Sequence, residues 1–300
     1  MYNPSFLGFE TNVLARMEFD SMAIPFCDRP ELGAAMKRRG KRITANSVYQ
    51  STWTRNLAAI QNNTERLSET DVEIVLSDAY VPGYKLQNPA LRNWFGETDA
   101  WWFDNVRRNL DKLGSPHLFA LGASLAMDVG DYVLSFDEST RQLRQPFSRV
   151  YERLWRNTLS PVNNSQNNSC QNRNDSEFLA ESFVELLYLH IPSNTFDQNS
   201  TVRWREEWTR GSGDFWDEFN SSQAGRIGSP VRSRSHLLRT FEETLSIASN
   251  MRHWAISIAD GGFISVQDAI DTVNRLRHVD KIYSKDFSEL TGVKATIITA

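Results

Sequence analysis

Cysteine, long apolar runs and surplus positive charge are all scarce in this sequence, and each scarcity excludes a class of protein. The 300 residues include two cysteines, Cys27 and Cys170, which lie far apart and outside any C-x-x-C pair. Neither a disulfide framework nor a cysteine-rich metal site is therefore expected. No apolar run approaches the roughly 20 residues that cross a bilayer, and the N-terminus lacks the pattern of a signal peptide. We expect a cytoplasmic protein that makes no contact with membranes.

The charge balance gives no general attraction to nucleic acid. The formal net charge is −4, so contact with DNA would depend on local basic patches. The charge neither requires DNA nor excludes it. Because 40% of the residues are apolar, the chain can bury a full core, and one large domain with an insertion fits its length better than two equal domains.

Alternating strand and helix patterns predict an α/β fold with a mainly parallel sheet and helices on both faces. The predicted strands are Ile24–Phe26, Ile43–Ala45, Phe183–Leu189 and Trp254–Ala259, and the predicted helices are Glu31–Arg39, one from about Val48, Leu237–Ala248 and Ser265–Leu276. Gly261 and Gly262 precede no Lys-Ser/Thr pair, so they predict a turn rather than a phosphate loop. Ligands of such sheets bind beyond the carboxyl ends of the strands, and the loops there are the first place to look for function.

The sequence divides into four parts. Residues 1–85 and 178–300 are the N-terminal and C-terminal parts of the α/β domain. Residues 86–160 are helical in pattern and predict an inserted subdomain that faces DNA or a partner. Residues 161–177 are rich in Asn, Ser and Gln, and we predict a mobile linker because this composition offers a core nothing to bury.

Aromatic residues concentrate in the predicted helical part and in a later segment. They are Trp94, Phe95, Trp101, Trp102 and Phe103, followed by Trp204, Trp208 and Trp216. An exposed binding surface is one interpretation of these residues. Aromatic residues at helical spacing more often pack in a core, which is the interpretation we favour.

Four segments occur in the order and at the spacing of motifs in one enzyme family. The segments are Phe6-Leu7-Gly8 with Asn12-Val13-Leu14, Pro25-Phe26 through Gly33 to Lys37-Arg38-Arg39-Gly40-Lys41-Arg42-Ile43-Thr44-Ala45-Asn46 with Gln61-Asn62-Asn63, Tyr188-Leu189-His190-Ile191-Pro192-Ser193-Asn194, and Ser233-Arg234-Ser235 through Phe241-Glu242 to Gly261-Gly262-Phe263-Ile264-Ser265. Over most of its length the chain thus resembles the Dam-like class of adenine-specific DNA methyltransferases, which use S-adenosylmethionine. The resemblance implies a Rossmann-like methyltransferase sheet.

The positions that would bind the cofactor depart from the family pattern. In the family, glycines of the first loop let the backbone approach the cofactor. Asp28 and Pro30 occupy these positions after Phe26, and the aspartate would face the cofactor's own carboxylate while the proline lacks a backbone donor. An acidic residue after the second strand would hold the ribose hydroxyls, and Ser47 stands there instead. We expect no bound cofactor, unless the chain is an active, divergent enzyme that uses S-adenosylmethionine.

The catalytic positions depart as well. Where the family has an Asp-Pro-Pro-Tyr motif, this chain has His190, Ile191, Pro192 and Ser193. The resemblance implies that the acidic residue accepts a hydrogen bond from the target amine and that the tyrosine stacks on the adenine. Because both groups are missing and base stacking alone is worth about 1 to 3 kcal/mol, we expect no catalytic residue. A structural role for His190 is favoured over general-base or metal chemistry, and no metal site is expected.

Two basic segments are candidates for contact with double-stranded DNA. Lys37 and Arg38 lie in a basic run that equally suits a helix end, where cations complement the helix dipole. The second group is better placed to meet phosphates, since the equivalent family segment faces DNA. It consists of Arg226, Arg232, Arg234 and Arg239.

Three functions follow from these patterns. The first is a catalytically degenerate methyltransferase homologue that binds DNA or pairs with an active methyltransferase or nuclease, as in a restriction-modification or defence system. The second is an active, divergent adenine methyltransferase in which His190, Ser193 or Asn194 replaces the missing acceptor. The third is an enzyme of another kind that uses His190 with Asp197, which no feature of the sequence supports. We favour the first, because three chemical motifs have changed while the apolar pattern persists.

Overall fold

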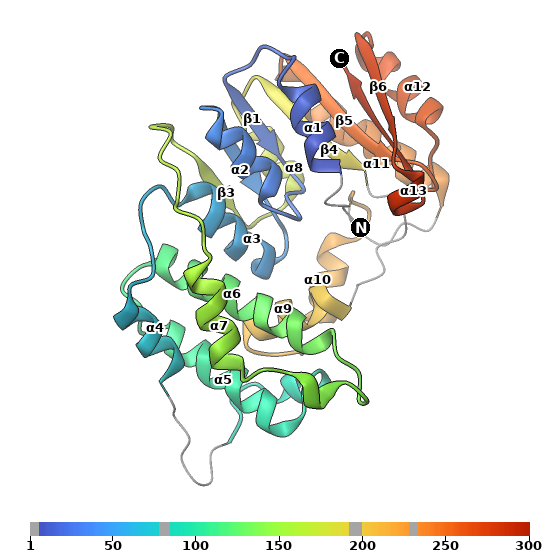
Figure 1. Ribbon diagram of the computed structural model, residues 1–300. Helices are drawn as coiled ribbons and strands as arrows, with labels where there is room; N and C mark the ends of the chain where they lie inside the picture. Colours follow the sequence, from blue (N-terminus) through green and yellow to red (C-terminus); the bar gives the residue numbers. More distant parts are fainter. Residues whose placement is uncertain (1–5, 78–84, 192–199, 228–232) are drawn as a thin grey trace. The chain divides into compact units, whose positions relative to one another are not determined.

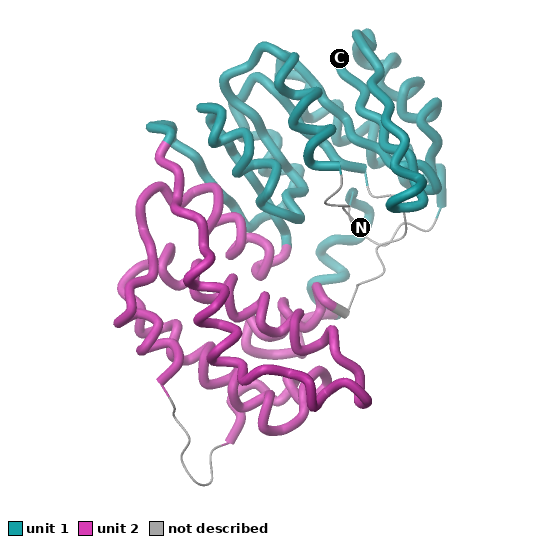
Figure 2. The backbone as a smooth tube through the Cα atoms, viewed as in Figure 1, with its two compact units in different colours: residues 1–48, 164–197, 217–300 teal, residues 49–163, 198–216 magenta. Residues whose placement is uncertain are grey.

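The computed structural model describes residues 6–77, 85–191, 200–227 and 233–300 (Figure 1). The chain divides into two compact units (Figure 2). Unit 1 comprises residues 1–48, 164–197 and 217–300, and unit 2 comprises residues 49–163 and 198–216. The chain therefore leaves unit 1 and returns to it twice.

Unit 1 is built on a seven-stranded, mostly parallel sheet whose strand order is β3-β2-β1-β4-β5-β7-β6. Its strands are β1 (Ser21–Ile24), β2 (Arg42–Asn46), β3 (Ser169–Gln171), β4 (Leu186–Ile191), β5 (His253–Ala259), β6 (Lys281–Asp286) and β7 (Lys294–Thr299). Strands β1 to β5 pair in parallel, and β7 is antiparallel to both β5 and β6. The α/β class predicted from the alternating pattern is confirmed.

Helices cover both faces of this sheet. The helices of unit 1 are α1 (Leu7–Leu14), α2 (Glu31–Arg38), α8 (Asp175–Ala180), α11 (Arg234–Ile247), α12 (Val266–Leu276) and α13 (Ser288–Thr291); the unit also contains most of α10 (Trp216–Gln223) and a short 3-10 turn at Ala248–Asn250. Side chains of β4 alternate between the faces. Leu187, Leu189 and Ile191 pack in a core with α8, α11 and α12, whereas Tyr188 contacts α1. These buried strands are apolar on both faces, as parallel strands covered by helices are.

Helix starts in unit 1 follow the expected capping chemistry. Ser265 and Asp268 form a capping box at the start of α12, in which each side chain accepts a hydrogen bond from the other residue's backbone N–H. The predicted helix Ser265–Leu276 is thereby confirmed to within one residue. Gly261 has a φ of +88° in the preceding turn, a conformation that glycine adopts without strain, so the predicted turn is also confirmed.

The regular secondary structure among the described residues of unit 2 is entirely helical. Its helices are α3 (Gln50–Asn56) with a π-helical continuation at Leu57–Gln61, α4 (Glu69–Leu76), α5 (Glu97–Leu110), α6 (Pro116–Leu134), α7 (Phe147–Arg156) and α9 (Ser200–Arg210), with 3-10 turns at Pro89–Asn93 and Arg141–Leu143. The helical unit is therefore larger than the predicted subdomain at residues 86–160. It begins at residue 49 and also includes α9, which comes from a later part of the chain. The core interpretation is confirmed for five of the eight aromatic residues, which are buried: Phe95, Phe103, Trp204, Trp208 and Trp216. Trp94, Trp101 and Trp102 are half-buried.

The predicted mobile linker at residues 161–177 was wrong. Residues 169–171 form β3, an edge strand that pairs with β2, and Asp175 begins α8. Asn164 donates hydrogen bonds to the carbonyl oxygens of Lys37 and Lys41 at 3.2 and 2.9 Å. Asn168 accepts one from the Ile43 N–H at 2.9 Å. The segment is held by amide side chains rather than by apolar burial, which composition alone does not reveal.

No helix in the part of the chain that the structure describes has the length and apolar character needed to cross a membrane.

Candidate functional site

The sheet order reverses between β1 and β4, so the loops that follow these strands run in opposite directions. The sequence-predicted cofactor residues Phe26, Asp28 and Pro30 follow β1, Ser47 follows β2, and His190 and Ile191 end β4. The fold therefore places these positions at one edge of the sheet. Pro192, Ser193 and the alternative partners Asn194 and Asp197 lie outside the described residues.

The loop after β1 is closed by hydrogen bonds of its own. The Cys27 N–H donates to the Asn46 carbonyl at 2.9 Å and the Asp28 N–H donates to the Phe26 carbonyl at 3.0 Å. Pro30 stands at the start of α2 with a φ of −73°, and its carbonyl accepts from the Ala34 N–H at 2.8 Å. A proline suits a helix start because it needs no intrahelical donor there. The backbone N–H groups of Cys27 and Asp28 are thus engaged with the protein itself.

The end of β2 is buried and fully engaged. Asn46 and Ser47 are 0% and 3% exposed. The Asn46 side-chain amide donates to the carbonyls of Pro25 and Arg173 at 3.3 and 3.0 Å, and its oxygen accepts from the Arg173 N–H at 3.2 Å. The Ser47 N–H donates to the Gln171 carbonyl at 3.1 Å. The residues expected near a ribose instead join β2 to the segment that follows β3.

Asp28 is in an environment that disfavours its charged form. Surrounding protein atoms raise its pKa from 3.8 to about 6, although its side chain keeps substantial solvent exposure. Desolvation by the surrounding protein is the main cause of this rise. A second carboxylate, such as that of an amino-acid ligand, would be repelled there by the ionised form.

A buried polar cluster at the carboxyl end of β4 was missed by sequence reasoning. Glu10 of α1 is 0% exposed. Its Oε1 accepts a hydrogen bond from the Tyr188 hydroxyl at 2.6 Å and from the Ser257 hydroxyl at 3.4 Å. The Ser257 Oγ lies 3.4 Å from His190 Nδ1. Because residues of α1, β4 and β5 build this cluster, only the register of His190 opposite Ser257 brings its members together.

The arrangement differs from a catalytic triad. In a triad the histidine bridges the serine and the acid, whereas here the Ser257 hydroxyl lies between the His190 ring and the Glu10 carboxylate. Ser257 is also only 2% exposed. Burial lowers the pKa of His190 from 6.5 to about 4, so the imidazole is neutral at pH 7. The cluster can fix the tip of β4 and present a neutral ring, but it does not expose a nucleophile.

His190 and Asp28 should make opposite contributions to acid stability. The unfolded chain protonates His190 below its ordinary pKa of 6.5 and the folded chain only below about 4, so stability falls as the pH drops through this window. The pKa of Asp28 is about 6 in the folded state and 3.8 in the unfolded state. The folded chain therefore binds the proton more readily, and the contribution of Asp28 to the free energy of unfolding rises as the pH drops. Relative to the parent chain, His190→Gln should gain stability between pH 6 and 4, on the order of 1 to 2 kcal/mol after reduction for solvent exposure.

Urea unfolding at a series of pH values checks this expectation. Asp28→Asn should show the opposite trend and lose stability relative to the parent as the pH drops. Parallel curves for both variants and the parent would contradict the assignments of these two groups.

The candidate DNA contacts occupy different environments. Lys37 is 1% exposed, and burial lowers its pKa to about 8, so it does not reach a phosphate in this conformation. Arg38 is exposed on α2. Burial raises the pKa of Asp175, and the positive charge of Arg226 opposes that rise.

The arginines of α11 are accompanied by acidic side chains. Arg234 forms a two-point ion pair with Asp268, and Arg239 lies 3.7 Å from Glu243. Arg232 lies outside the described residues. The described part of this arginine series is therefore locally neutralised, which weakens its attraction to phosphates.

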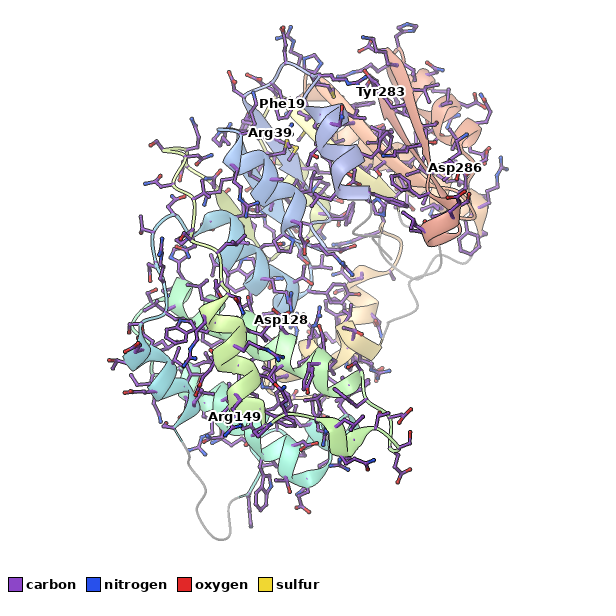
Figure 3. All side chains as sticks on the ribbon, viewed as in Figure 1. Phe19, Arg39, Asp128, Arg149, Tyr283 and Asp286 are labelled. Carbon is purple, nitrogen blue, oxygen red and sulfur yellow. The ribbon has the colours of Figure 1, made fainter. Side chains whose placement is uncertain are left out.

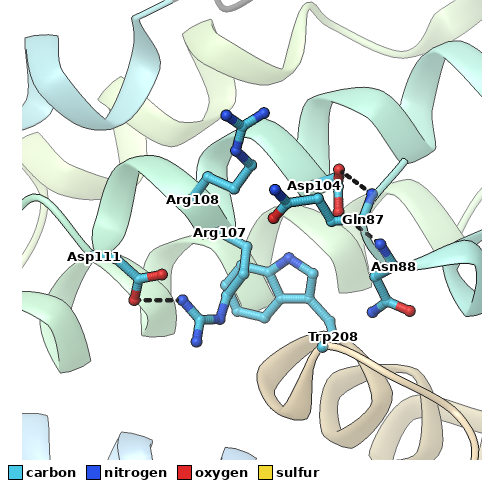
Figure 4. Close-up of a pocket in the computed structure, with 8 residues that line it drawn as sticks. Gln87, Asn88, Asp104, Arg107, Arg108, Asp111 and Trp208 are labelled. Carbon is cyan, nitrogen blue, oxygen red and sulfur yellow. Dashed lines mark hydrogen bonds and ion pairs between the residues drawn. The ribbon is translucent and has the colours of Figure 1, made fainter. Parts of the chain in front are cut away.

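Unit 2 contains a small polar pocket of about 140 Å³. It is lined by Gln87, Asn88, Asp104, Arg107, Arg108, Asp111, Trp208 and Gly211 (Figure 4). The Asp104 carboxylate accepts from the Gln87 and Asn88 N–H groups at 3.0 and 3.1 Å, and Arg107 donates to Asp111 at 2.7 Å. Asp104 thus holds the loop before the 3-10 turn Pro89–Asn93, whereas Arg107 and Asp111 pair with each other at the end of α5.

In the described part of the chain, no three His, Cys, Asp or Glu side chains converge as metal ligands would. No protein-family model and no curated protein matches the chain.

Proposed function

We propose that this chain is a methyltransferase-like protein that does not transfer methyl groups and acts as a binding subunit. The strand order supports this proposal. Strands β3, β2, β1, β4 and β5 lie side by side in parallel, and β7 is inserted antiparallel between β5 and β6. This arrangement is the one expected of the methyltransferase fold. Fold alone does not define function, so the proposal depends on the residues at the edge of the sheet.

The observation that carries the proposal is the closure of the loop after β1 against β2. The Cys27 N–H is bound to the Asn46 carbonyl, and the Asn46 side chain is bound to Pro25 and Arg173. A nucleoside that displaced these contacts would leave buried polar groups without partners, at a cost of about 1 to 3 kcal/mol for each group. Together with Asp28, this disfavours a ligand that brings both a ribose and a carboxylate.

The partner of the binding subunit is either DNA or another protein, such as an active methyltransferase or nuclease of a restriction-modification or defence system. The ion pairs of Arg234 and Arg239 favour a protein partner, because a phosphate would have to compete with a carboxylate for each arginine. Fluorescence polarisation with duplex DNA at two salt concentrations separates the two. We expect the chain to bind duplex DNA weakly, with an affinity that changes little between the two salt concentrations. An affinity that falls steeply with added salt would identify DNA as the partner.

An active, divergent methyltransferase is the second candidate, and the state of His190 favours it. Its imidazole is neutral at pH 7, because burial lowers its pKa to about 4, and a neutral ring nitrogen can accept a hydrogen bond from an amine. Incubation of duplex DNA with methyl-labelled S-adenosylmethionine tests this candidate. We expect no label above background. Incorporation that is lost in His190→Ala would establish the enzyme and overturn the proposed function.

A further inference from the structure

The outer strand of the sheet in unit 1 offers an open edge. Strand β6 stands last in the strand order, and β7 is its only partner strand among the residues that the structure describes. Tyr283 is half-buried, and the other five residues of β6 are exposed. Figure 3 labels Tyr283 and Asp286 on this strand. In an antiparallel pair, alternate residues turn their N–H and C=O groups away from the partner strand. The edge can therefore hydrogen-bond one more extended chain.

One face of β6 carries positive charge. Lys281, Tyr283 and Lys285 alternate along the strand, so their side chains share a face. The Arg16 guanidinium lies 5.7 Å from the centre of the Tyr283 ring, and the Lys285 Nζ lies 5.1 Å from the centre of the Phe287 ring. Among the described residues, no carboxylate forms an ion pair with Arg16, Lys281 or Lys285. This differs from α11, where Arg234 and Arg239 are paired.

Two of the registers in which a second copy of the chain could pair with this edge are unfavourable. Antiparallel pairing about a twofold axis at Tyr283 would set Lys281 of each copy opposite Lys285 of the other. Pairing about Ser284 would set the Ile282 side chain opposite the Asp286 carboxylate. Like charges directly opposite one another destabilise a sheet, and an apolar side chain opposite a carboxylate gains nothing.

We propose that the β6 edge binds an extended, acidic segment of a partner protein by strand addition. This rests on the proposed function, since it names the chemistry of the partner that the binding subunit takes. Backbone hydrogen bonds would hold the added strand, and carboxylates at alternate positions would lie opposite Lys281 and Lys285. Arg16 adds a third positive charge on the same face.

The probe is a short fluorescent peptide in which glutamate alternates with threonine, measured by polarisation at low salt with the full chain. Two further peptides carry backbone N-methyl groups on alternate residues, one on the odd and one on the even positions. Strand addition uses the N–H groups of one edge of the peptide, so exactly one methylated peptide should lose binding. Equal binding of both would overturn strand addition, and so would tighter binding of a single-stranded oligonucleotide of the same charge.

The variant Lys281→Glu with Lys285→Glu should weaken peptide binding about tenfold at low salt. Lys85→Glu with Lys112→Glu is the matched control, because it changes the net charge equally from exposed lysines of unit 2. An equal loss of peptide binding in both double variants would overturn the assignment to β6. The proposal would also be overturned if the parent chain were a dimer that dissociates when Lys281 and Lys285 are both replaced by glutamate. Methyl transfer to DNA would overturn the proposed function without altering the peptide result, so the two failures are distinguishable.

Discussion

Replacing Glu206 with alanine is expected to lower the free energy of unfolding of unit 2 by about 3 to 5 kcal/mol, the range seen when one partner of a buried ion pair is removed. Glu206 lies on α9 and is 0% exposed. Its carboxylate accepts hydrogen bonds from the N–H groups of Gln50 and Ser51 at 2.8 and 2.9 Å and from the Ser51 hydroxyl at 2.7 Å. It also pairs with Arg210 at 2.7 Å.

The size of the effect follows from what remains after the substitution. Two N–H groups at the start of α3 and a guanidinium would lose their acceptor, while the helix dipole would lose a compensating negative charge. Glu206→Gln retains one acceptor oxygen and should lose less stability. Glu73→Ala removes an exposed carboxylate on α4 of the same unit and should change stability by less than about 0.5 kcal/mol.

Urea unfolding followed by tryptophan fluorescence measures this effect in the intact chain. Eight of the nine tryptophans lie in the residue ranges of unit 2 and only Trp254 lies in unit 1, so the signal reports the unfolding of unit 2. A loss for Glu206→Ala no larger than that for Glu73→Ala would contradict the capping role of Glu206.

Truncation of Trp204 to alanine should cost unit 2 about 3 to 5 kcal/mol, the range found for large buried aromatic residues. The Trp204 ring is 0% exposed and meets the rings of Phe95 and Phe103 at centroid distances of 5.4 and 5.7 Å. A side chain on Gly130 of α6 would place its Cβ 2.1 Å from the Trp204 ring. The helix and the indole therefore fit together only because residue 130 has no side chain.

Gly130→Ala should accordingly destabilise unit 2 by about 1 to 3 kcal/mol, even though alanine favours a helix more than glycine does. In the Trp204→Ala background the same change should cost much less, because the clash is gone. Gly114→Ala is the control, since a Cβ there meets no atom within 4 Å. Equal effects of Gly130→Ala in the two backgrounds would refute the contact.

The sequence predicted those elements whose burial follows a simple period. The helix at Glu31–Arg39 and the strand at Ile43–Ala45 agree with α2 and β2 to within one residue. The strand around Ile24–Phe26 was placed too late, because Pro25 and Phe26 are apolar but belong to the loop after β1. The period of a short apolar run does not show where hydrogen bonding between strands ends.

Interactions between residues far apart in the sequence were not predictable in this way. Asn168 carries no apolar signal, yet its side chain anchors the start of β2. Glu10 would be expected on the exposed side of an N-terminal helix, but Tyr188 and Ser257 supply the donors that allow its burial. A buried polar group is defined by its partners, and these became visible only with the sheet register.

The candidate site was located by its motif positions, but its chemistry was only partly anticipated. The departures of Asp28, Pro30 and Ser47 from the pattern of the family that the chain resembles predict a poor cofactor pocket, and this stays a prediction. The structure adds that Pro30 directly precedes α2. It also shows Asn46 and the backbone of Ser47 bound to Pro25, Gln171 and Arg173. The sequence did not show which residues of the basic run at Lys37 are buried and which are exposed.

Calorimetric titration of the purified chain with S-adenosylmethionine is the most direct test of the account, with an active adenine methyltransferase titrated in the same buffer as the positive control. We expect no heat of binding from this chain, because the N–H groups of Cys27 and Asp28 are bound within the protein and an ionised Asp28 would repel the carboxylate of the methyl donor. Saturable binding in the micromolar range, weakened when Asp28 or Ser47 is replaced, would contradict the central claim.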